Sequence, residues 1–159
     1  MLFRSKIIIE NKQLGTGGSI LNAVKQLSLK EEFLLINGDT WIDSGFSKIR
    51  SAHSSSVAVV EVKNTGRYGS IQVDNDDNII EFSEKKIGTF GLINSGLFKF
   101  YPNDLSNFTP ETSSLEYEIL PYLAKKKKLK AIKIDANFID IGIPYDYSKF
   151  CEMIKNETN

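Results

Sequence analysis

The chain has 159 residues, 41% of them hydrophobic and 25% charged, which is enough to build one soluble domain with its own core. Its 20 basic and 20 acidic side chains cancel, so no global field attracts nucleic acid or an anionic membrane, and we expect neither as a partner. The single cysteine, Cys151, excludes an internal disulfide, and no apolar stretch is long enough to cross a bilayer, so we expect a cytoplasmic protein.

The first segment with a chemical interpretation is glycine-rich. Lys6–Glu10 (K-I-I-I-E) predicts a short buried strand, and the helical spacing of apolar residues predicts a helix over Ser19–Leu27. Between them lies Leu14–Gly18 (L-G-T-G-G), which lacks both the G-K-[ST] ending of a P-loop and the G-x-G-x-x-G spacing of a Rossmann turn. A strand, glycine-rich loop and helix can present backbone N–H groups to a phosphate, but a helix start without a ligand explains the same pattern.

The central segment is Phe33–Asp43 (F-L-L-I-N-G-D-T-W-I-D). The unbroken apolar run Phe33–Ile36 predicts a strand buried on both faces of a sheet. We interpret Gly38 as the residue that allows the chain to turn, which leaves Asp39 at the carboxyl end of a central strand. Ligand crevices of open α/β sheets lie at that edge, and a carboxylate there suits a hard cation carrying a phosphate. The alternative is an ordinary turn.

The middle of the chain predicts a helix followed by four strands. The helix covers Gly45–His53, and we assign no catalytic role to His53 because no Ser or Cys partner is apparent. The strands are expected at Val57–Val62, Ser70–Asp74, Ile79–Ser83 and Phe90–Phe100. Glycine weakens a strand, so Asn94-Ser95-Gly96 indicates either a bulge or a ligand that approaches closely.

The last third predicts two helices and two strands. A helix over Ser113–Lys127 is expected to kink or restart at Pro121, and its lysine-rich end, Lys125–Lys128, is interpreted as solvated. An edge strand follows at Leu129–Asp135 and a short strand carrying Asp140 at Asn137–Ile141. A final helix begins at Pro144. It is expected to bury four residues at helical spacing, namely Tyr147, Phe150, Cys151 and Ile154.

Together these elements predict an α/β fold with a mixed, mostly parallel sheet flanked by helices. Asp39 and Asp140 both follow strands and both precede a break. If they meet at one sheet edge, they could hold a Mg²⁺ that bridges phosphates. No Ser-His or Cys-His pair supplies a nucleophile, so catalysis would depend on positioning and charge neutralisation.

An ordered set of motifs resembles the sugar-1-phosphate nucleotidyltransferases. The set runs along almost the whole chain: L-G-T-G-G-S-I (Leu14–Ile20), L-I-N-G-D (Leu35–Asp39), R-Y-G-S-I (Arg67–Ile71), F-S-E-K (Phe82–Lys85), I-N-S-G-L-F (Ile93–Phe98), S-L-E (Ser114–Glu116) and F-I-D-I-G-I-P-Y-D-Y (Phe138–Tyr147). Within that family the chain is most similar to the enzymes that join D-glycero-D-manno-heptose 1-phosphate or mannose 1-phosphate to GMP. The resemblance implies a Rossmann-like nucleotide-diphospho-sugar transferase fold.

The resemblance also implies roles for individual residues. Asp39 and Asp140 would hold the Mg²⁺, and Lys85 would bind the sugar phosphate and hold its oxygen for attack on the α-phosphorus. Substrate contacts would come from residues along the chain, namely Gly15, Thr16 and Gly17 at the nucleobase and ribose and Gly69, Glu84 and Asn94 at the sugar. The implied substrates are GTP and a sugar 1-phosphate, in nucleotide-sugar synthesis for lipopolysaccharide or capsule.

One family segment has no counterpart in this sequence. Members of the family begin with a strand and a G-G-x-G-T-R loop, so we interpret residues 1–159 as a single, N-terminally incomplete domain that lacks its first strand and glycine-rich loop. The implied partners are then a complementing N-terminal fragment or a second copy. Two alternatives stay open: an inactive fragment that only binds a nucleotide sugar or a partner chain, and a glycosyltransferase. The latter ranks last because Asn37-Gly38-Asp39 has no D-x-D pair.

Overall fold

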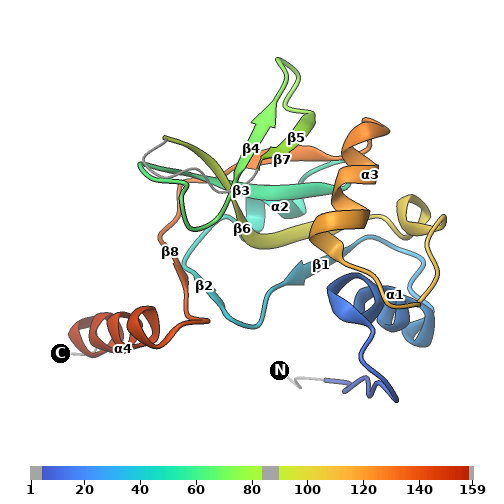
Figure 1. Cartoon of the computed structure of the whole chain (residues 1–159), viewed down its shortest axis with the longest axis horizontal. Helices are drawn as coiled ribbons and strands as arrows, with labels where there is room; N and C mark the ends of the chain where they lie inside the picture. Colours follow the sequence, from blue (N-terminus) through green and yellow to red (C-terminus); the bar gives the residue numbers. More distant parts are fainter. Residues whose placement is uncertain (1–4, 84–89, 158–159) are drawn as a thin grey trace.

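The computed structural model describes residues 5–83 and 90–157 (Figure 1). Its helical elements are α1 (Gly15–Leu27), α2 (Phe46–Arg50), the 3₁₀ turn η1 (Pro102–Leu105), the π-helical turn η2 (Leu115–Ile119), α3 (Leu120–Lys125) and α4 (Pro144–Glu157). Its strands are β1 (Phe33–Ile36), β2 (Thr40–Ile42), β3 (Ser56–Val62), β4 (Ser70–Val73), β5 (Ile79–Ser83), β6 (Gly91–Phe100), β7 (Lys130–Lys133) and β8 (Phe138–Asp140).

The main sheet has the strand order β5-β4-β6-β3-β7, with β1 paired to the far end of β6. A second sheet consists of β2 and β8. The sheet is mixed, and the α/β fold class is confirmed. The expected excess of parallel strands is not found in the described residues, where β3 and β7 form the parallel pair and the other strand pairs are antiparallel. Strand β7 lies at the sheet edge, as the sequence predicts.

Strand β3, which lies between β6 and the edge strand β7, is buried on both faces. Val57 and Val59 pack in a cluster beneath α1, η2 and α3, whereas Ala58 and Val60 pack on the opposite face with Ile49 of α2. This alternation follows from the two-residue period of a strand. It produces three layers, with α1, η2 and α3 packed on one face of the sheet and α2 on the other.

Strand β6 contains the irregularity that its glycines predict. Val57 pairs with Phe98 but Val59 pairs with Asn94, so β6 carries two extra residues between these pairs. Gly96 has a φ of +74°, in the left-handed region that favours glycine. Beyond this bulge the strand continues into the core, where Leu97, Phe98 and Phe100 are fully buried.

Two strands expected at the start of the chain behave differently from the prediction. Residues Lys6–Glu10 form no strand, and Ile7 and Ile9 are 84% and 77% exposed. Strand β1 forms where expected, but it is not buried on both faces, because Leu34 and Ile36 are 41% and 46% exposed. In both segments an apolar run was interpreted as burial. In the described residues β1 pairs with β6, and one of its faces is left uncovered.

The helices lie near the predicted positions, except that α1 begins at Gly15, within the predicted glycine-rich loop, and not at Ser19. The helix expected over Ser113–Lys127 restarts as predicted beside Pro121, where the π-helical turn η2 gives way to α3. In α4 the expected buried face is wrong for Tyr147, which is 55% exposed, and the other three residues are only partly buried. The reason is visible in Figure 1, where α4 extends away from the main body beside β2 and β8.

Within residues 5–83 and 90–157, none of the helices has the length and apolarity needed to cross a bilayer.

Candidate functional site

The loop after β1 and the bulge of β6 lie against each other. The Asn37 N–H donates a hydrogen bond to the Gly96 carbonyl at 2.9 Å. A Cβ added to Gly96 would lie 2.7 Å from the Thr40 hydroxyl, so this approach depends on glycine. The N-G-D and N-S-G motifs, which are far apart in the sequence, therefore form one surface. Gly38 itself does not have a positive φ, so the turn does not require the glycine that the sequence analysis assigned to it.

The two predicted carboxylates, Asp39 and Asp140, meet beside Gly142, and we call them the carboxylate pair. Strands β2 and β8 pair antiparallel with Thr40 opposite Asp140, and the Ile141 N–H donates to the Asp39 carbonyl at 2.8 Å. A Cβ built on Gly142 would lie 3.1 Å from Asp140 Oδ1 and 3.3 Å from Asp39 Oδ2. Oxygens from both carboxylates therefore face the same small volume, which the missing side chain of Gly142 leaves open.

The chemistry of this pair fits a magnesium ion. Magnesium is bound in proteins by one or two carboxylates, with water and substrate phosphates supplying the other oxygens. No cluster of three His, Cys, Asp or Glu side chains that could hold a metal occurs among the described residues, so within them the two carboxylates would not form a complete cage. Such a site depends on a phosphate-bearing ligand to complete it.

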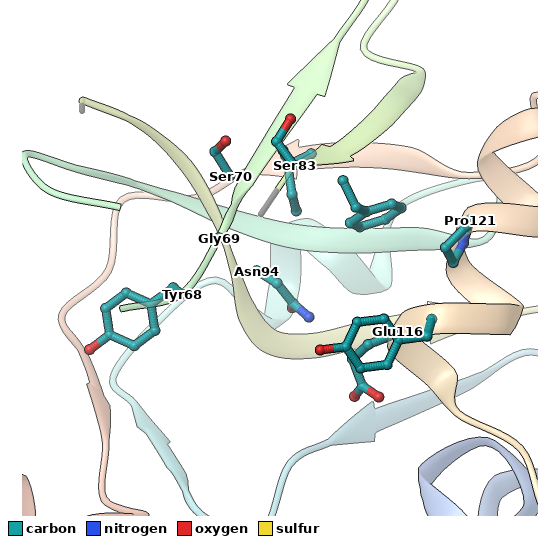
Figure 2. Close-up of a pocket in the computed structure, with 10 residues that line it drawn as sticks. Tyr68, Gly69, Ser70, Ser83, Asn94, Glu116 and Pro121 are labelled. Atoms are coloured by element: carbon teal, nitrogen blue, oxygen red, sulfur yellow. The ribbon is translucent and has the colours of Figure 1, made fainter. Parts of the chain in front are cut away.

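A cavity of about 430 Å³ opens at the junction of β4, β5, β6 and η2 (Figure 2), and we call it the pocket. Ten residues line it: Tyr68, Gly69, Ser70, Ile71, Phe82, Ser83, Asn94, Glu116, Tyr117 and Pro121. Two of the predicted sugar contacts, Gly69 and Asn94, are therefore brought together here. The third, Glu84, and the predicted catalytic Lys85 lie outside the described residues.

Glu116 is a pocket residue to which the sequence analysis assigned no role. Its Oε2 accepts hydrogen bonds from the Thr16 hydroxyl at 2.8 Å and from the Ser114 hydroxyl at 3.2 Å. Thr16 in turn accepts from the Leu115 N–H at 2.9 Å. The S-L-E motif was the available signal, but only the fold shows that its carboxylate reaches both α1 and the pocket. Glu116 and Asn94 enter the pocket from different elements, η2 and β6 (Figure 2).

The glycine-rich start of α1 is packed against protein. The Ser113 carbonyl accepts hydrogen bonds from the Gly17 and Gly18 N–H groups at 3.0 and 3.4 Å. These are among the N–H groups that an anion at a helix start would need. Of the predicted nucleobase and ribose contacts, Gly15 and Thr16 are exposed and Gly17 is buried. The geometry thus favours the interpretation of this segment as a closely packed helix start over that of a phosphate cradle.

The loop of residues 64–69 joins the pocket to the last part of the chain. Arg67 forms an ion pair with Asp146 of α4, and the Tyr68 ring packs edge-on against Phe138 of β8 with centroids 5.4 Å apart. The hydrogen bond from Arg67 holds the pKa of the Asp146 carboxyl below its usual value and raises the pKa of Arg67. Burial raises the pKa of Tyr68.

We compared the sequence with models of known protein families. Residues 3–157 match the family model described as "Nucleotidyl transferase". The chain belongs to the nucleotidyl transferase family. The family interpretation made from the motifs is therefore confirmed over nearly the whole chain.

Individual members of this family narrow the comparison. The chain is 36% identical to D-glycero-alpha-D-manno-heptose 1-phosphate guanylyltransferase of Campylobacter jejuni over 146 residues, which cover 91% of this chain and 65% of the relative. It is 30% identical to mannose-1-phosphate guanylyltransferase catalytic subunit beta of Drosophila pseudoobscura, covering 87% of this chain and 39% of the relative. The chain thus spans less than two thirds of the length of these relatives.

Solved structures agree with the sequence relatives. HddC from Yersinia pseudotuberculosis superposes with a TM-score of 0.80 at 38% identity, covering 92% of this chain and 65% of HddC. HddC complexed with GMP-PN gives a TM-score of 0.78 at 37% identity and the same coverage. A UDP-glucose pyrophosphorylase from Acinetobacter, at 19% identity and a TM-score of 0.68, shares the fold.

Proposed function

We propose that this chain transfers GMP from GTP to a heptose or mannose type of sugar 1-phosphate. An oxygen of the sugar phosphate would attack the α-phosphorus of GTP, forming a new P–O bond while the bond to the β-phosphate oxygen breaks and pyrophosphate leaves. The observation that carries the proposal is the meeting of Asp39 and Asp140 at Gly142, in a chain 36% identical to a heptose 1-phosphate guanylyltransferase. Phosphoryl-type transfer depends chiefly on positioning and charge neutralisation, which such a site can supply.

The pocket would hold the sugar. Asn94 offers an amide that both donates and accepts hydrogen bonds, Gly69 allows a ligand to approach the backbone, and Glu116 offers a carboxylate acceptor for sugar hydroxyls. Thr16 and Ser114 fix the Glu116 carboxylate, so a hydroxyl would meet a preoriented group. Glu84 and Lys85, outside the described residues, keep the roles proposed from the motifs: hydroxyl acceptor and phosphate-binding cation.

Asp39 and Asp140 would hold Mg²⁺. When bound, the ion would neutralise phosphate charge, leaving the pocket residues to orient the sugar. Gly15, Thr16 and Gly17 would contribute the surface near the nucleobase and ribose, with Thr16 and Glu116 linking that surface to the pocket.

The test is a turnover assay that follows pyrophosphate release from GTP and Mg²⁺ with either D-glycero-D-manno-heptose 1-phosphate or mannose 1-phosphate. We expect release by the unaltered protein and none by Asp39→Ala, with Asp76→Asn as the matched control because Asp76 is an exposed carboxylate in the β4–β5 turn. Release by Asp39→Ala at the unaltered rate would refute the metal role. Binding of GDP-mannose without any release would instead support a non-catalytic fragment.

We further propose that a second copy of the chain or a complementing fragment covers β1. The support is the exposure of Leu34 and Ile36 on a strand whose apolar run suits burial. Sizing measurements should therefore show association, or a gain in solubility on coexpression with the complementing fragment. A stable monomer with no such gain would refute this proposal. We place the reaction in the cytoplasm, supplying nucleotide sugar for lipopolysaccharide or capsule.

A further inference from the structure

The loop of residues 64–69 holds its own shape through local hydrogen bonds. The Thr65 carbonyl accepts from the Tyr68 and Gly69 N–H groups at 2.9 and 3.1 Å, and Asn64 Oδ1 accepts from the Gly66 N–H at 2.9 Å. Gly69 has a φ of +73°, and a Cβ there would lie 2.9 Å from the Ser83 carbonyl. The loop therefore behaves as a compact turn that presents Arg67 and Tyr68 together.

These two side chains reach the same neighbouring unit, which consists of β8 and α4. Arg67 pairs with Asp146 in the first turn of α4, and Tyr68 contacts Phe138 of β8. Asp146 is only 6% exposed, and a carboxylate this buried is costly unless it is paired and hydrogen-bonded. The ion pair therefore joins a buried carboxylate of α4 to an arginine whose side chain is 46% exposed.

The Arg67–Asp146 ion pair and the Tyr68–Phe138 contact connect two parts of the candidate site. Tyr68 and Gly69 form one wall of the pocket, whereas Phe138 lies two residues before Asp140 on β8. A shift of the loop relative to β8 would therefore change the spacing between the pocket and the carboxylate pair. Productive sites need their groups held within about 0.5 Å, so such a shift has chemical consequences.

We propose that Arg67 and Asp146 are a positioning pair that holds the pocket wall in fixed relation to the carboxylates of Asp39 and Asp140. The distance between the pocket and the carboxylate pair would affect the binding of a ligand that spans both, with its sugar in the pocket and its phosphate at the carboxylate pair. Binding of the sugar and of Mg²⁺ is then coupled through the pair. This consequence rests on the proposed function, but the geometry of the pair can be tested without any ligand.

Four variants separate positioning from simple stabilisation. Arg67→Ala breaks the pair, Arg67→Lys keeps the charge without the planar fork, and the double variant Arg67→Asp with Asp146→Arg reverses the pair. Arg50→Ala is the matched control, because Arg50 is an exposed arginine in the last turn of α2.

The first readout uses the unliganded proteins. The nuclear Overhauser effect between the Tyr68 and Phe138 rings reports the position of the loop. Emission from Trp41, the single tryptophan, reports the seating of α4 because Trp41 packs against Phe150 at 5.8 Å. We expect Arg67→Ala to weaken the ring signal and shift the emission to the red, and Arg67→Lys or the reversed pair to restore both in part. An unchanged ring signal in Arg67→Ala would overturn the inference.

The second readout is the gain in GDP-mannose affinity that Mg²⁺ produces, measured by calorimetry. We expect the gain to fall about fivefold or more in Arg67→Ala, at the lower end of typical couplings between sites, and to stay unchanged in Arg50→Ala. If the ring signal is lost but the gain is kept, the pair is merely structural and the inference fails. If the unaltered protein binds no GDP-mannose, the mannose form of the proposed function fails, whereas the Tyr68–Phe138 ring signal still decides whether the pair holds the loop against β8.

Discussion

The start of α1 and the turn after β8 both contain glycine beside chemically suggestive residues, yet the two regions use glycine differently. At the start of α1 a Cβ on Gly18 would lie 2.1 Å from the Glu111 carbonyl, so protein fills the space. At Gly142 the atoms that a Cβ would meet are carboxylate oxygens of Asp39 and Asp140. The first glycine permits packing, and the second leaves room between two charged groups.

The difference teaches that a glycine-rich pattern does not reveal what lies opposite the missing side chain. The N–H groups of Gly17 and Gly18 already donate to Ser113, so a helix start that resembles an anion site is occupied by backbone. At Gly142, Asp140 Oδ1 accepts a hydrogen bond from the Gly142 N–H at 3.0 Å, but neither carboxylate forms an ion pair with a cationic side chain among the described residues. Alanine at Gly18 should therefore lower the stability of the fold, whereas alanine at Gly142 should lower metal affinity and leave stability nearly unchanged.

The largest effect on stability is expected for Gly18→Ala. Replacing glycine by alanine inside a helix normally stabilises it by about 1 kcal/mol, but here the added methyl group would collide with backbone. We expect the free energy of unfolding to fall by about 2–3 kcal/mol, the range for overpacking, in urea titrations. Lys25→Ala, an exposed position on the same helix, should change it by less than about 0.5 kcal/mol. Equal stability of the two variants would remove the packing explanation.

The complementary effect is expected for Gly142→Ala. Its methyl group would press on both carboxylates by a few tenths of an ångström while meeting little else. We expect Mn²⁺ affinity, followed by electron paramagnetic resonance, to fall about tenfold, the lower end for disturbing a metal's surroundings. The free energy of unfolding should hardly change. If Gly142→Ala loses stability but keeps its metal affinity, then Gly142, like Gly18, is needed for packing and not for the space beside the carboxylates.

The next test addresses how the carboxylate side of the molecule is held together. Because Arg67 lowers the pKa of Asp146 in the folded state, the pair stabilises the fold above the unfolded value of about 3.9, and this stabilisation is lost as the pH falls through the folded pKa. Asp146→Asn should therefore be less stable than the unaltered protein at pH 7, and the gap should narrow as the pH falls below about 3.9. Unfolding curves measured down this pH range give the difference, and a gap that does not narrow would contradict the charge-based account.

The smallest effect is expected for Gly38→Ala, next to Asp39. Its φ is not positive, and a Cβ there would meet nothing within 4 Å. We expect a change within about 0.5 kcal/mol, with a slight stabilisation because alanine restricts the unfolded chain. Thermal unfolding measures it. A loss comparable to that of Gly18→Ala would mean that the turn needs its glycine after all.

Much of the fold could be predicted because strand signals are local. The period and composition of residues 57–62 and 79–83 placed β3 and β5 within about one residue, and the glycines of β6 predicted its bulge. The failures involve apolar runs whose burial depends on distant partners. Ile7, Ile9, Leu34 and Ile36 are as apolar as any core residue, but the described residues leave them 84%, 77%, 41% and 46% exposed.

In the candidate site, the sequence predicted that the two carboxylates would lie together, but it did not reveal the contacts made between distant segments of the chain. Asp39 and Asp140 were paired from their places after strands, and the structure brings them together. Glu116 and Arg67 belong to recognised motifs, but their contacts could not be predicted, because their partners Thr16 and Asp146 are 100 and 79 residues away. No local pattern in a single sequence encodes such pairings.

The bulge in β6 has a consequence for how this chain can change. It divides one strand into a half that carries Asn94 and a half that carries Leu97, Phe98 and Phe100. Because the register is reset between them, the half that lines the pocket and the half that pairs with β1 need not keep one common register. The side chain at position 94 can therefore vary while Leu97–Phe100 stay paired with β1.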